Sequence, residues 1–337
     1  MKRKLLALSL ALMMLGGALA GCGQKSTETS PVPESAAPET SAPVEATAQP
    51  TQEAEGTVHF AVLNGPTGVG AAKLMADNDA GTTANHYEVE VFTANDQVAA
   101  GLTNGEIDIA AVASNVAANL YNKTDGGVQM LAVSGLGVLY ILENGDSVHS
   151  VADLAGRTLY ATGQGANPEY VLNYLLTENG VDPAGVDIQW KTGDEITTLM
   201  VSGEADLCML PVPAATAVQL KNGDVREALD LSAEWDSLNN GSRLTMTTIV
   251  ARTGFIQENP QAVENFLADY QASVDYVNGD PAAAAELVAG YGITANAQIA
   301  EAAIPKCALV CITGASEMRS AIQGYYEVLY QASPESI

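Results

Sequence analysis

Two segments far apart in the chain share one pattern. In residues 102–112, and again in residues 200–210, a helix-forming tail reaches a Gly, Glu-x-Asp follows, and a short apolar run comes next. Gly at this place is typical of a helix end, and an apolar run bounded by turn residues indicates a buried parallel strand. Helix-forming sequence then resumes, at Ser114-Asn115 in one copy and at Pro211-Val212-Pro213 in the other. The repeat predicts two similar α/β lobes whose strand-end loops face each other across a cleft.

The first residues have the composition of an export signal. Residues 1–21 begin with three basic residues and continue with an apolar stretch that is too short to span a bilayer comfortably. Leu19-Ala20-Gly21-Cys22 follows and resembles the bacterial lipobox, in which the Cys is lipidated and becomes the mature N-terminus. The pattern predicts a lipoprotein signal peptide with lipidation at Cys22, and an ordinary signal peptide with an incidental Cys is the alternative.

The segment after Cys22 predicts a tether. Residues 23–56 are rich in Ser, Thr, Pro, Ala and Glu and contain no aromatic residue. Such a composition cannot bury enough apolar surface to offset the entropy lost on ordering. We therefore expect residues 22–56 to form a lipidated Cys and a disordered tether. The protein would sit on the outer face of the cytoplasmic membrane, at the cell surface if there is one membrane and on the periplasmic side if there are two.

The charge balance excludes two kinds of partner. The chain has 40 acidic and 14 basic residues, with a formal net charge of −26. A surface this acidic argues against nucleic acid and against adhesion to an anionic membrane surface. We expect a monomer that binds no nucleic acid and touches the membrane only through its lipid.

Cysteine and histidine usage gives no sign of a metal or a cofactor. Cys208, Cys307 and Cys311 make an odd number beyond Cys22, which is untypical of a disulfide framework. Cys307 and Cys311 have the spacing of one helix face, so two alternatives remain for them: free buried thiols or a local disulfide. The three histidines are scattered, at His59, His86 and His149. None has metal-ligand spacing or neighbours a nucleophile, so we expect no metal, no cofactor and no enzymatic activity.

The order of apolar runs predicts a discontinuous first lobe. Lobe 1 is expected to comprise residues 57–137 plus 245–337, and lobe 2 residues 138–244, with crossovers around Ser134–Val138 and Met246–Val250. From Pro260 to about Gln331 the pattern predicts helices, punctuated by glycines.

Several of these features together resemble a known family. The lipobox, the Gly65-Pro66-Thr67-Gly68 loop, the Gly-Glu-x-Asp repeat and the loop at residues 163–170 resemble the solute-binding lipoproteins of ABC importers. The similarity is to the branch of nitrate, sulfonate and taurine carriers and of thiamine-pyrimidine-precursor binders, which have the type 2 periplasmic-binding-protein-like fold. One departure is Pro211-Val212-Pro213, where relatives often have Pro-Glu-Pro.

The resemblance implies both a fold and a function. The fold is an α/β two-lobed clamshell, in which each lobe is a mainly parallel sheet flanked by helices and two crossovers join the lobes. The function is capture of a small molecule between the lobes and its delivery to an ABC importer permease. The alternative is a sensor or partner-binding lipoprotein that uses the same clamshell without transport. An enzyme on this scaffold is expected less than either of these two functions.

The candidate ligand-binding residues lie in loops that lead into helix N-termini. Free backbone N–H groups and the positive end of the helix dipole favour an accepting ligand group there. Thr67, Ser114 and Asn167 have an alternative role as helix caps only. Because basic residues are scarce, we expect a small neutral, zwitterionic or singly charged ligand. The candidates are Gly65, Pro66, Thr67, Gly68, Ser114, Asn115, Gln164, Asn167, Pro211 and Pro213.

Overall fold

The computed structural model describes residues 56–337. The signal peptide predicted for residues 1–21, lipidation at Cys22 and the tether up to residue 55 therefore lie outside the described residues. No helix within the described range is long and apolar enough to cross a membrane.

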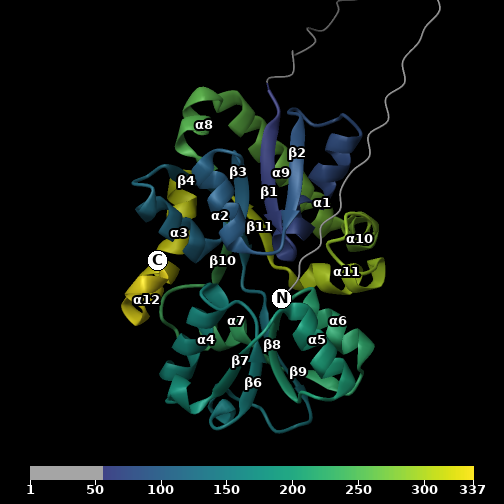
Figure 1. Ribbon diagram of the computed structural model, residues 1–337, viewed down its shortest axis with the longest axis vertical. Helices are drawn as coiled ribbons and strands as arrows, with labels where there is room; N and C mark the ends of the chain where they lie inside the picture. Colours follow the sequence, from purple (N-terminus) through teal and green to yellow (C-terminus); the bar gives the residue numbers. More distant parts are fainter. Residues whose placement is uncertain (1–55) are drawn as a thin grey trace, which may run out of the picture. The chain divides into compact units, whose positions relative to one another are not determined.

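Two mixed β-sheets form the framework (Figure 1). The first sheet has the strand order β11-β4-β10-β3-β1-β2, and the second has the order β7-β6-β8-β5-β9. The strands of the first sheet are β1 (Val58–Leu63), β2 (Tyr87–Phe92), β3 (Ile109–Ala113), β4 (Val128–Leu136), β10 (Thr245–Arg252) and β11 (Leu309–Ile312). Those of the second are β5 (Leu139–Asn144), β6 (Thr158–Ala161), β7 (Asp187–Trp190), β8 (Leu207–Pro211) and β9 (Val225–Asp230).

The two sheets share one arrangement of strand directions. In the first sheet β1 pairs in parallel with β2 and β3, and β10 runs antiparallel to both β3 and β4. In the second sheet β6 pairs in parallel with β7 and β8, and β5 runs antiparallel to both β8 and β9. The first sheet has the additional edge strand β11, antiparallel to β4. The predicted α/β two-lobed fold is confirmed, and most strands of each lobe point in one direction.

The repeated sequence pattern forms the same structure in both lobes. Helix α2 (Asn95–Asn104) ends at Gly105, and helix α5 (Gly193–Ser202) ends at Gly203. Both glycines are in the left-handed region, with φ of 88° and 76°, where a residue with a Cβ would be strained. Strand β3 follows in one lobe and β8 in the other, and each lies between a parallel and an antiparallel neighbour.

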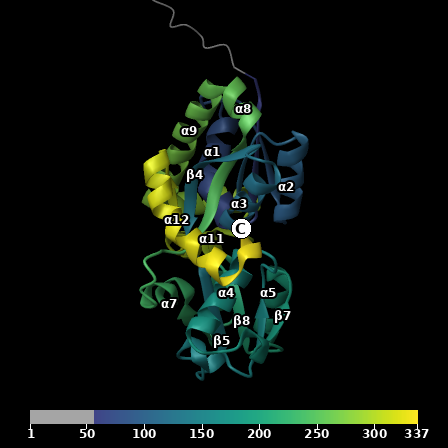
Figure 2. The ribbon, with the colours of Figure 1, turned by 90° about the vertical axis from the view of Figure 1, so that its left-hand side faces the viewer.

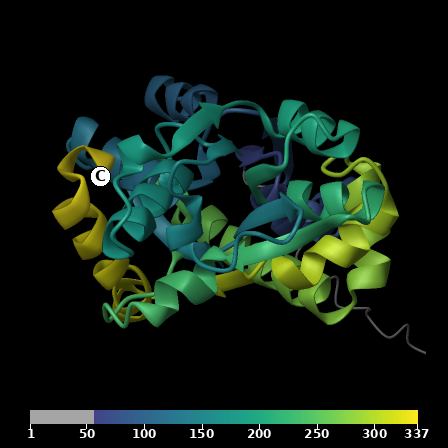
Figure 3. The ribbon, with the colours of Figure 1, turned by 90° about the horizontal axis from the view of Figure 1, so that it is seen from below.

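Helices cover both sheets. Figures 1 and 2 show α1, α8, α9 and α10 around the first sheet and α5, α6 and α7 around the second. Figure 3 shows the yellow C-terminal helix and the yellow-green helices of residues 281–303 at opposite ends of the described part. The remaining helices are α1 (Pro66–Asp79), α3 (Ser114–Lys123), α4 (Asn167–Glu178), α6 (Ala214–Lys221), α7 (Leu231–Ser237), α8 (Thr253–Glu258), α9 (Pro260–Gly279), α10 (Pro281–Gly290), α11 (Ala297–Ala303) and α12 (Ala315–Ala332).

Each lobe has an aromatic group in its core. In the first lobe the ring of Phe60 packs edge-on against Phe266 of α9, with centroids 4.9 Å apart. In the second lobe Trp235 is fully buried, 4.8 Å from the ring of Tyr174 and 5.5 Å from that of Tyr325. Because Tyr325 belongs to α12, the C-terminal helix packs into the core of the second lobe as well as against β4, β10 and β11 of the first.

The chain passes between the sheets at two places. The first passage is Gly137-Val138, between β4 and β5, within the predicted segment Ser134–Val138. The second lies between α7 and β10, before residue 245. Met246–Val250, where the sequence predicted this crossover, instead lies inside β10 and pairs with β3 and β4. This segment is the strand that receives the chain, and the link lies before it.

Near the C-terminus the expectation of helices alone was wrong. Leu309–Ile312 forms the edge strand β11, which is short and is followed closely by Gly314. Cys311 lies in this strand and Cys307 precedes it, so the two do not share a helix face, and Cys208, Cys307 and Cys311 are all free. Burial raises the pKa of Cys208 and of Cys307 to about 12, so both thiols stay protonated at neutral pH.

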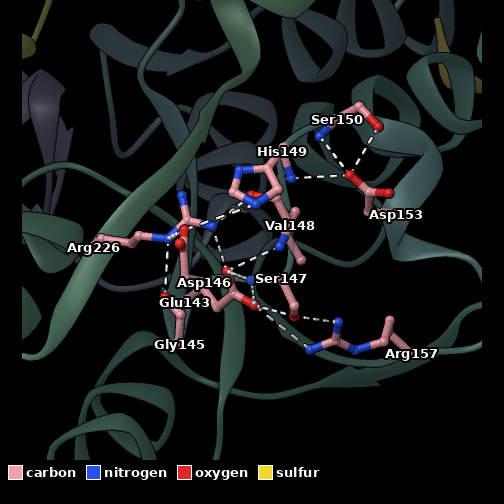
Figure 4. Close-up of polar contacts among 10 residues, drawn as sticks. All are labelled: Glu143, Gly145, Asp146, Ser147, Val148, His149, Ser150, Asp153, Arg157 and Arg226. Atoms are coloured by element: carbon pink, nitrogen blue, oxygen red, sulfur yellow. Dashed lines mark hydrogen bonds and ion pairs between the residues drawn. The ribbon is translucent and has the colours of Figure 1, made fainter.

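A buried carboxylate organises the loop after β5 (Figure 4). Glu143 is only 2% exposed. Its Oε1 accepts a hydrogen bond from the Ser147 hydroxyl at 2.5 Å, and its Oε2 accepts one from the Val148 N–H at 3.1 Å. Arg226 of β9 donates to Oε2 at 2.6 Å, and Arg157 lies 3.8 Å from Oε1. Burial works to raise the pKa of Glu143, but the hydrogen bonds from Ser147 and Val148 and the charge of Arg226 outweigh it, so the pKa is lowered.

We predict that Glu143→Gln lowers the free energy of unfolding at pH 7 by about 1–3 kcal/mol, because it removes the charge that holds Arg226. Since the pKa of Glu143 is lower in the folded state than in the unfolded state, its ionised form stabilises the fold above the unfolded pKa. This contribution is lost as the pH falls through the folded pKa. The stability difference between wild type and variant should therefore narrow below about pH 4. Urea titrations at several pH values measure this, with the exposed Glu204→Gln as the matched control.

Candidate functional site

The N-termini of α3 and α4 meet where the two lobes touch. The side chain of Asn167, the first residue of α4, donates through Nδ2 to Ser114 Oγ at 2.9 Å and to the carbonyl oxygen of Met246 at 2.7 Å. The backbone N–H of Asn167 donates to Asn115 Oδ1 at 3.1 Å. Three candidates that are far apart in the sequence thus form one polar junction, which we call the α3–α4 junction.

The strands place these residues together. Ser114 and Asn115 follow directly after β3, and Asn167 ends the loop after β6. β3 and β6 occupy the interior of their sheets, and their carboxyl ends lead into the junction, as expected for open α/β sheets. Ser114, Asn115 and Asn167 are at most 1% exposed, so their polar groups depend on one another for hydrogen bonds.

Two further contacts fix the first-lobe side of the junction. The Ser114 hydroxyl donates to the carbonyl oxygen of Thr245 at 2.5 Å, at the start of β10. The Tyr326 hydroxyl of α12 donates to the carbonyl oxygen of Ser114 at 2.7 Å, and burial raises the pKa of Tyr326 above its ordinary value. One acceptor is left over, because Asn167 Oδ1 is buried and has no hydrogen-bond partner among the described residues.

A groove of about 1160 Å³ opens beside this junction. Its walls are α2 and α3 of the first lobe and the β6–α4 loop of the second. It is lined by Thr93, Ala94, Asn95, Asp96, Ala99, Ala100, Thr103, Asn104, Asn115, Val116, Asn119, Leu120, Lys123, Thr124, Thr162, Gly163, Gln164, Gly165 and Ala166.

The groove offers hydrogen-bonding groups and little charge. Amide and hydroxyl side chains dominate its polar lining, which includes one cation, Lys123, and one anion, Asp96. Both charged residues are exposed. Two predicted site residues line it from opposite lobes, Asn115 and Gln164. The arrangement suits a polar ligand of low charge that is held by hydrogen bonds.

The β1–α1 loop lies at another strand end of the first lobe. The buried Thr67 hydroxyl both donates to and accepts from the backbone of Leu63 at 3.0 Å, so it closes the loop. Gly65 has a φ of 139°, and a Cβ on Gly68 would come within 3.0 Å of the Leu63 carbonyl oxygen. Gly65, Pro66, Thr67 and Gly68 are absent from the lining of the groove.

The two prolines lie at the end of β8, the second-lobe counterpart of β3. Pro211 is the last residue of β8 and is half-buried, and Pro213 immediately precedes α6. Neither is among the residues that line the groove. Of the ten candidates, the structure therefore brings together Ser114, Asn115, Gln164 and Asn167.

The alternative role as helix caps does not describe Thr67, Ser114 or Asn167. The N-cap positions of α1, α3 and α4 are Gly65, Ala113 and Ala166, without a side-chain capping bond. Each of the three polar residues lies inside the first turn and uses its side chain elsewhere.

Three amides of the groove, Asn95, Asn104 and Asn119, were not among the predicted site residues. Asn95 begins α2, and its Oδ1 accepts from the Ala113 N–H at 3.3 Å. Asn119 lies one turn after Asn115 on α3, and that spacing is the signal that a helix-face argument would have used.

A second contact joins the lobes away from the groove. Lys306, which precedes β11, pairs with Glu227 of β9 at 2.7 Å. Its ammonium lies 5.3 Å from the ring centroid of Tyr140 in β5. The lobes are therefore in direct contact on two sides.

We predict that Ser114→Ala and Asn167→Ala are energetically coupled. Each single variant removes one side of a buried bond, so the double variant should lose less stability than the sum of the singles, by about 0.5–3 kcal/mol. Urea unfolding of the four proteins measures the coupling. The pair Asn167→Ala and Thr177→Ala is the control and should be additive, since the Thr177 hydroxyl bonds only to Asn173 of its own helix. Strict additivity in the first pair would contradict the junction.

Comparison with protein families and solved structures agrees with this architecture. Residues 128–284 match the family model described as NMT1/THI5 like. No curated protein matches the chain significantly.

Solved structures that resemble the chain include an ABC transporter protein and two sulfonate-binding proteins. An ABC transporter protein from Parabacteroides distasonis is 22% identical with a TM-score of 0.69, and the match covers 84% of this chain and 95% of that one. The periplasmic aliphatic sulphonate-binding protein of Escherichia coli is 17% identical with a TM-score of 0.62, covering 81% and 88%. The alkanesulfonate-binding protein of Xanthomonas axonopodis pv. citri, bound to MOPS, is 15% identical with a TM-score of 0.65, covering 83% and 94%.

These likenesses support the resemblance found in the sequence. At these identities, the solved structures establish the fold. Residues 128–284 are thus similar to the NMT1/THI5-like family model, and the chain has the two-lobed fold of the periplasmic binding proteins of ABC transporters.

Proposed function

We propose that the protein is an extracytoplasmic solute-binding protein that captures a small molecule between its lobes and delivers it to an ABC importer permease. The observation that carries this proposal is the groove whose walls come from both lobes and whose lining includes Asn115 and Gln164. A ligand that touches both walls binds the closed arrangement better than an open one and so shifts the protein towards closure. The structural relatives are named as binding proteins and transporter components, which favours an importer over a sensor or an enzyme.

The proposal includes attachment to the membrane. Lipidation of Cys22 would hold the protein on the outer face of the cytoplasmic membrane, and the Ser- and Pro-rich residues 23–56 would let it reach the permease. Mass spectrometry of the purified native N-terminus tests this part, since a lipidated Cys22 gives a diacyl mass increment that a plain signal-peptidase product lacks.

Solute binding predicts a thermal shift. A ligand at a hundred times its dissociation constant stabilises the folded state by about 2.7 kcal/mol, which should raise the Tm by several degrees. The panel contains sulfonates, nitrate, thiamine pyrimidines, amino acids, short peptides and cyclic ureides. The double variant Asn115→Ala/Gln164→Ala should lose the shift because it removes one contact from each wall.

Two outcomes would contradict the proposal. Full affinity in the double variant would place the ligand elsewhere, and a panel without any hit would remove the main support for solute binding. Uptake assays then separate transport from sensing, since cells that lack the chain should fail to import the solute that gives the shift.

A further inference from the structure

We propose that the groove recognises a solute with a carbonyl acceptor beside an N–H donor, that is an amide or ureide edge, through Asn115 and Asn119. This inference rests on the proposed function and names the substrate class of its site. Both residues line the groove from α3, one helical turn apart. Side chains at this spacing are neighbours on the helix surface.

The orientation of the Asn115 amide is fixed by its partner. The backbone N–H of Asn167 is a donor, so the atom that faces it must be the accepting Oδ1. The Nδ2 group of Asn115 is consequently the side-chain donor that this bond does not use, and it bonds to no other described residue. Asn115 is 1% exposed and lines the groove, so a donor that is otherwise buried is available to a ligand there.

The orientation of the Asn119 amide is fixed in the opposite sense. Its Nδ2 donates to the carbonyl oxygens of Asn115 at 3.2 Å and of Ser336 at 3.0 Å. Carbonyl oxygens only accept, so these two bonds must come from the NH₂ group, and Oδ1 is the atom left over. Side by side on α3, the groove therefore presents a donor from Asn115 and an acceptor from Asn119.

A donor beside an acceptor is complementary to an amide edge and unsuited to an oxyanion. A sulfonate or nitrate offers only acceptors, so it would satisfy Asn115 Nδ2 and leave Asn119 Oδ1 facing negative oxygen. The lining adds one cation, the exposed Lys123 at the last residue of α3, away from the Asn115 end. The Arg fork that oxyanion sites commonly use is absent from this lining.

Lactams and cyclic ureides carry this edge in one ring, and a short extended peptide carries it along its backbone. The groove volume of about 1160 Å³ has room for either. Calorimetry with hydantoin, N-acetylglycine methylamide, methanesulfonate and nitrate separates the cases, since the glycine of the methylamide carries an N–H and a neutral C=O on the same side when extended. We expect hydantoin or N-acetylglycine methylamide to bind at least tenfold more tightly than both oxyanions, and the one of these two that binds more tightly shows whether a ring or a peptide backbone supplies the edge.

The decisive variant is Asn115→Asp. It keeps an acceptor for the Asn167 N–H and replaces the free donor with a second acceptor, so the affinity for the amide probe should fall at least tenfold. Asn122→Asp is the matched control, because it adds the same charge to the same helix at an exposed residue outside the groove, and its affinity should equal that of wild type. Asn119→Leu, which removes the acceptor, should also weaken binding at least tenfold. The Tm of each variant verifies folding.

If methanesulfonate or nitrate binds tightly and the amide probes do not bind, the inference is overturned and the solute-binding proposal stands. Binding of an amide that survives both Asn115→Asp and Asn119→Leu would likewise overturn it. If none of the four probes binds, the amide inference fails, and the broader solute panel decides the proposed function separately.

Discussion

The chain passes twice between the lobes, and the strand that follows each passage is the constraint on which the rest of the structure depends. β5 comes directly from the first lobe through Gly137-Val138 and is hydrogen-bonded on both sides, between β8 and β9. β10 returns the chain and lies between β3 and β4 in the same way. Each crossing strand is thus an interior strand of the sheet it joins. Neither lobe can release its crossing strand without breaking two ladders of backbone hydrogen bonds, so lobe motion must be confined to the short links.

The two passages also explain why the polar junction forms where it does. With the sheets held by two links, the carboxyl ends of β3 and β6 bring α3 and α4 together, and their first turns meet. Asn167 then satisfies a hydroxyl and a backbone carbonyl of the other lobe. A buried polar group without a partner costs about 1–3 kcal/mol, so removal of this side chain affects both lobes. The contact between Lys306 and Glu227 limits motion on another side.

The sequence predicted the fold to the extent that local patterns determine it. The Gly-Glu-x-Asp repeat placed two helix ends and two interior strands correctly, because a left-handed Gly followed by an apolar run has few alternatives. The prediction of helices alone failed at Leu309–Ile312, because this edge strand is defined by its pairing with β4 and not by its composition. The second crossover was predicted inside β10, because a run of β-forming residues does not show whether it is a strand of a sheet or the link that leads to that strand.

The candidate site was predictable as a set of strand ends but not as a geometry. Asn115 and Asn167 were found because their loops lead into helix N-termini, whereas Asn95 and Asn119 belong to the groove through their position on a helix face. Which loops meet was not readable from the sequence, because it depends on how the lobes pack. The Gly65–Gly68 loop has the same local chemistry as the loops before α3 and α4. The Thr67 hydroxyl, however, makes its hydrogen bonds to the backbone of Leu63.

The strong acidity of the chain and the near-neutrality of the groove are consistent with each other. A net charge of −26 repels anions at long range, so an anion would need a local cationic site to overcome that field. The groove provides amides whose donor and acceptor ends are set by bonds to Asn167 and to two carbonyl oxygens. Selectivity built in this way depends on the direction of hydrogen bonds and hardly on charge. Because the bond from Asn167 to Asn115 both joins the lobes and orients the Asn115 amide, closure of the lobes and selection of the ligand are parts of one arrangement.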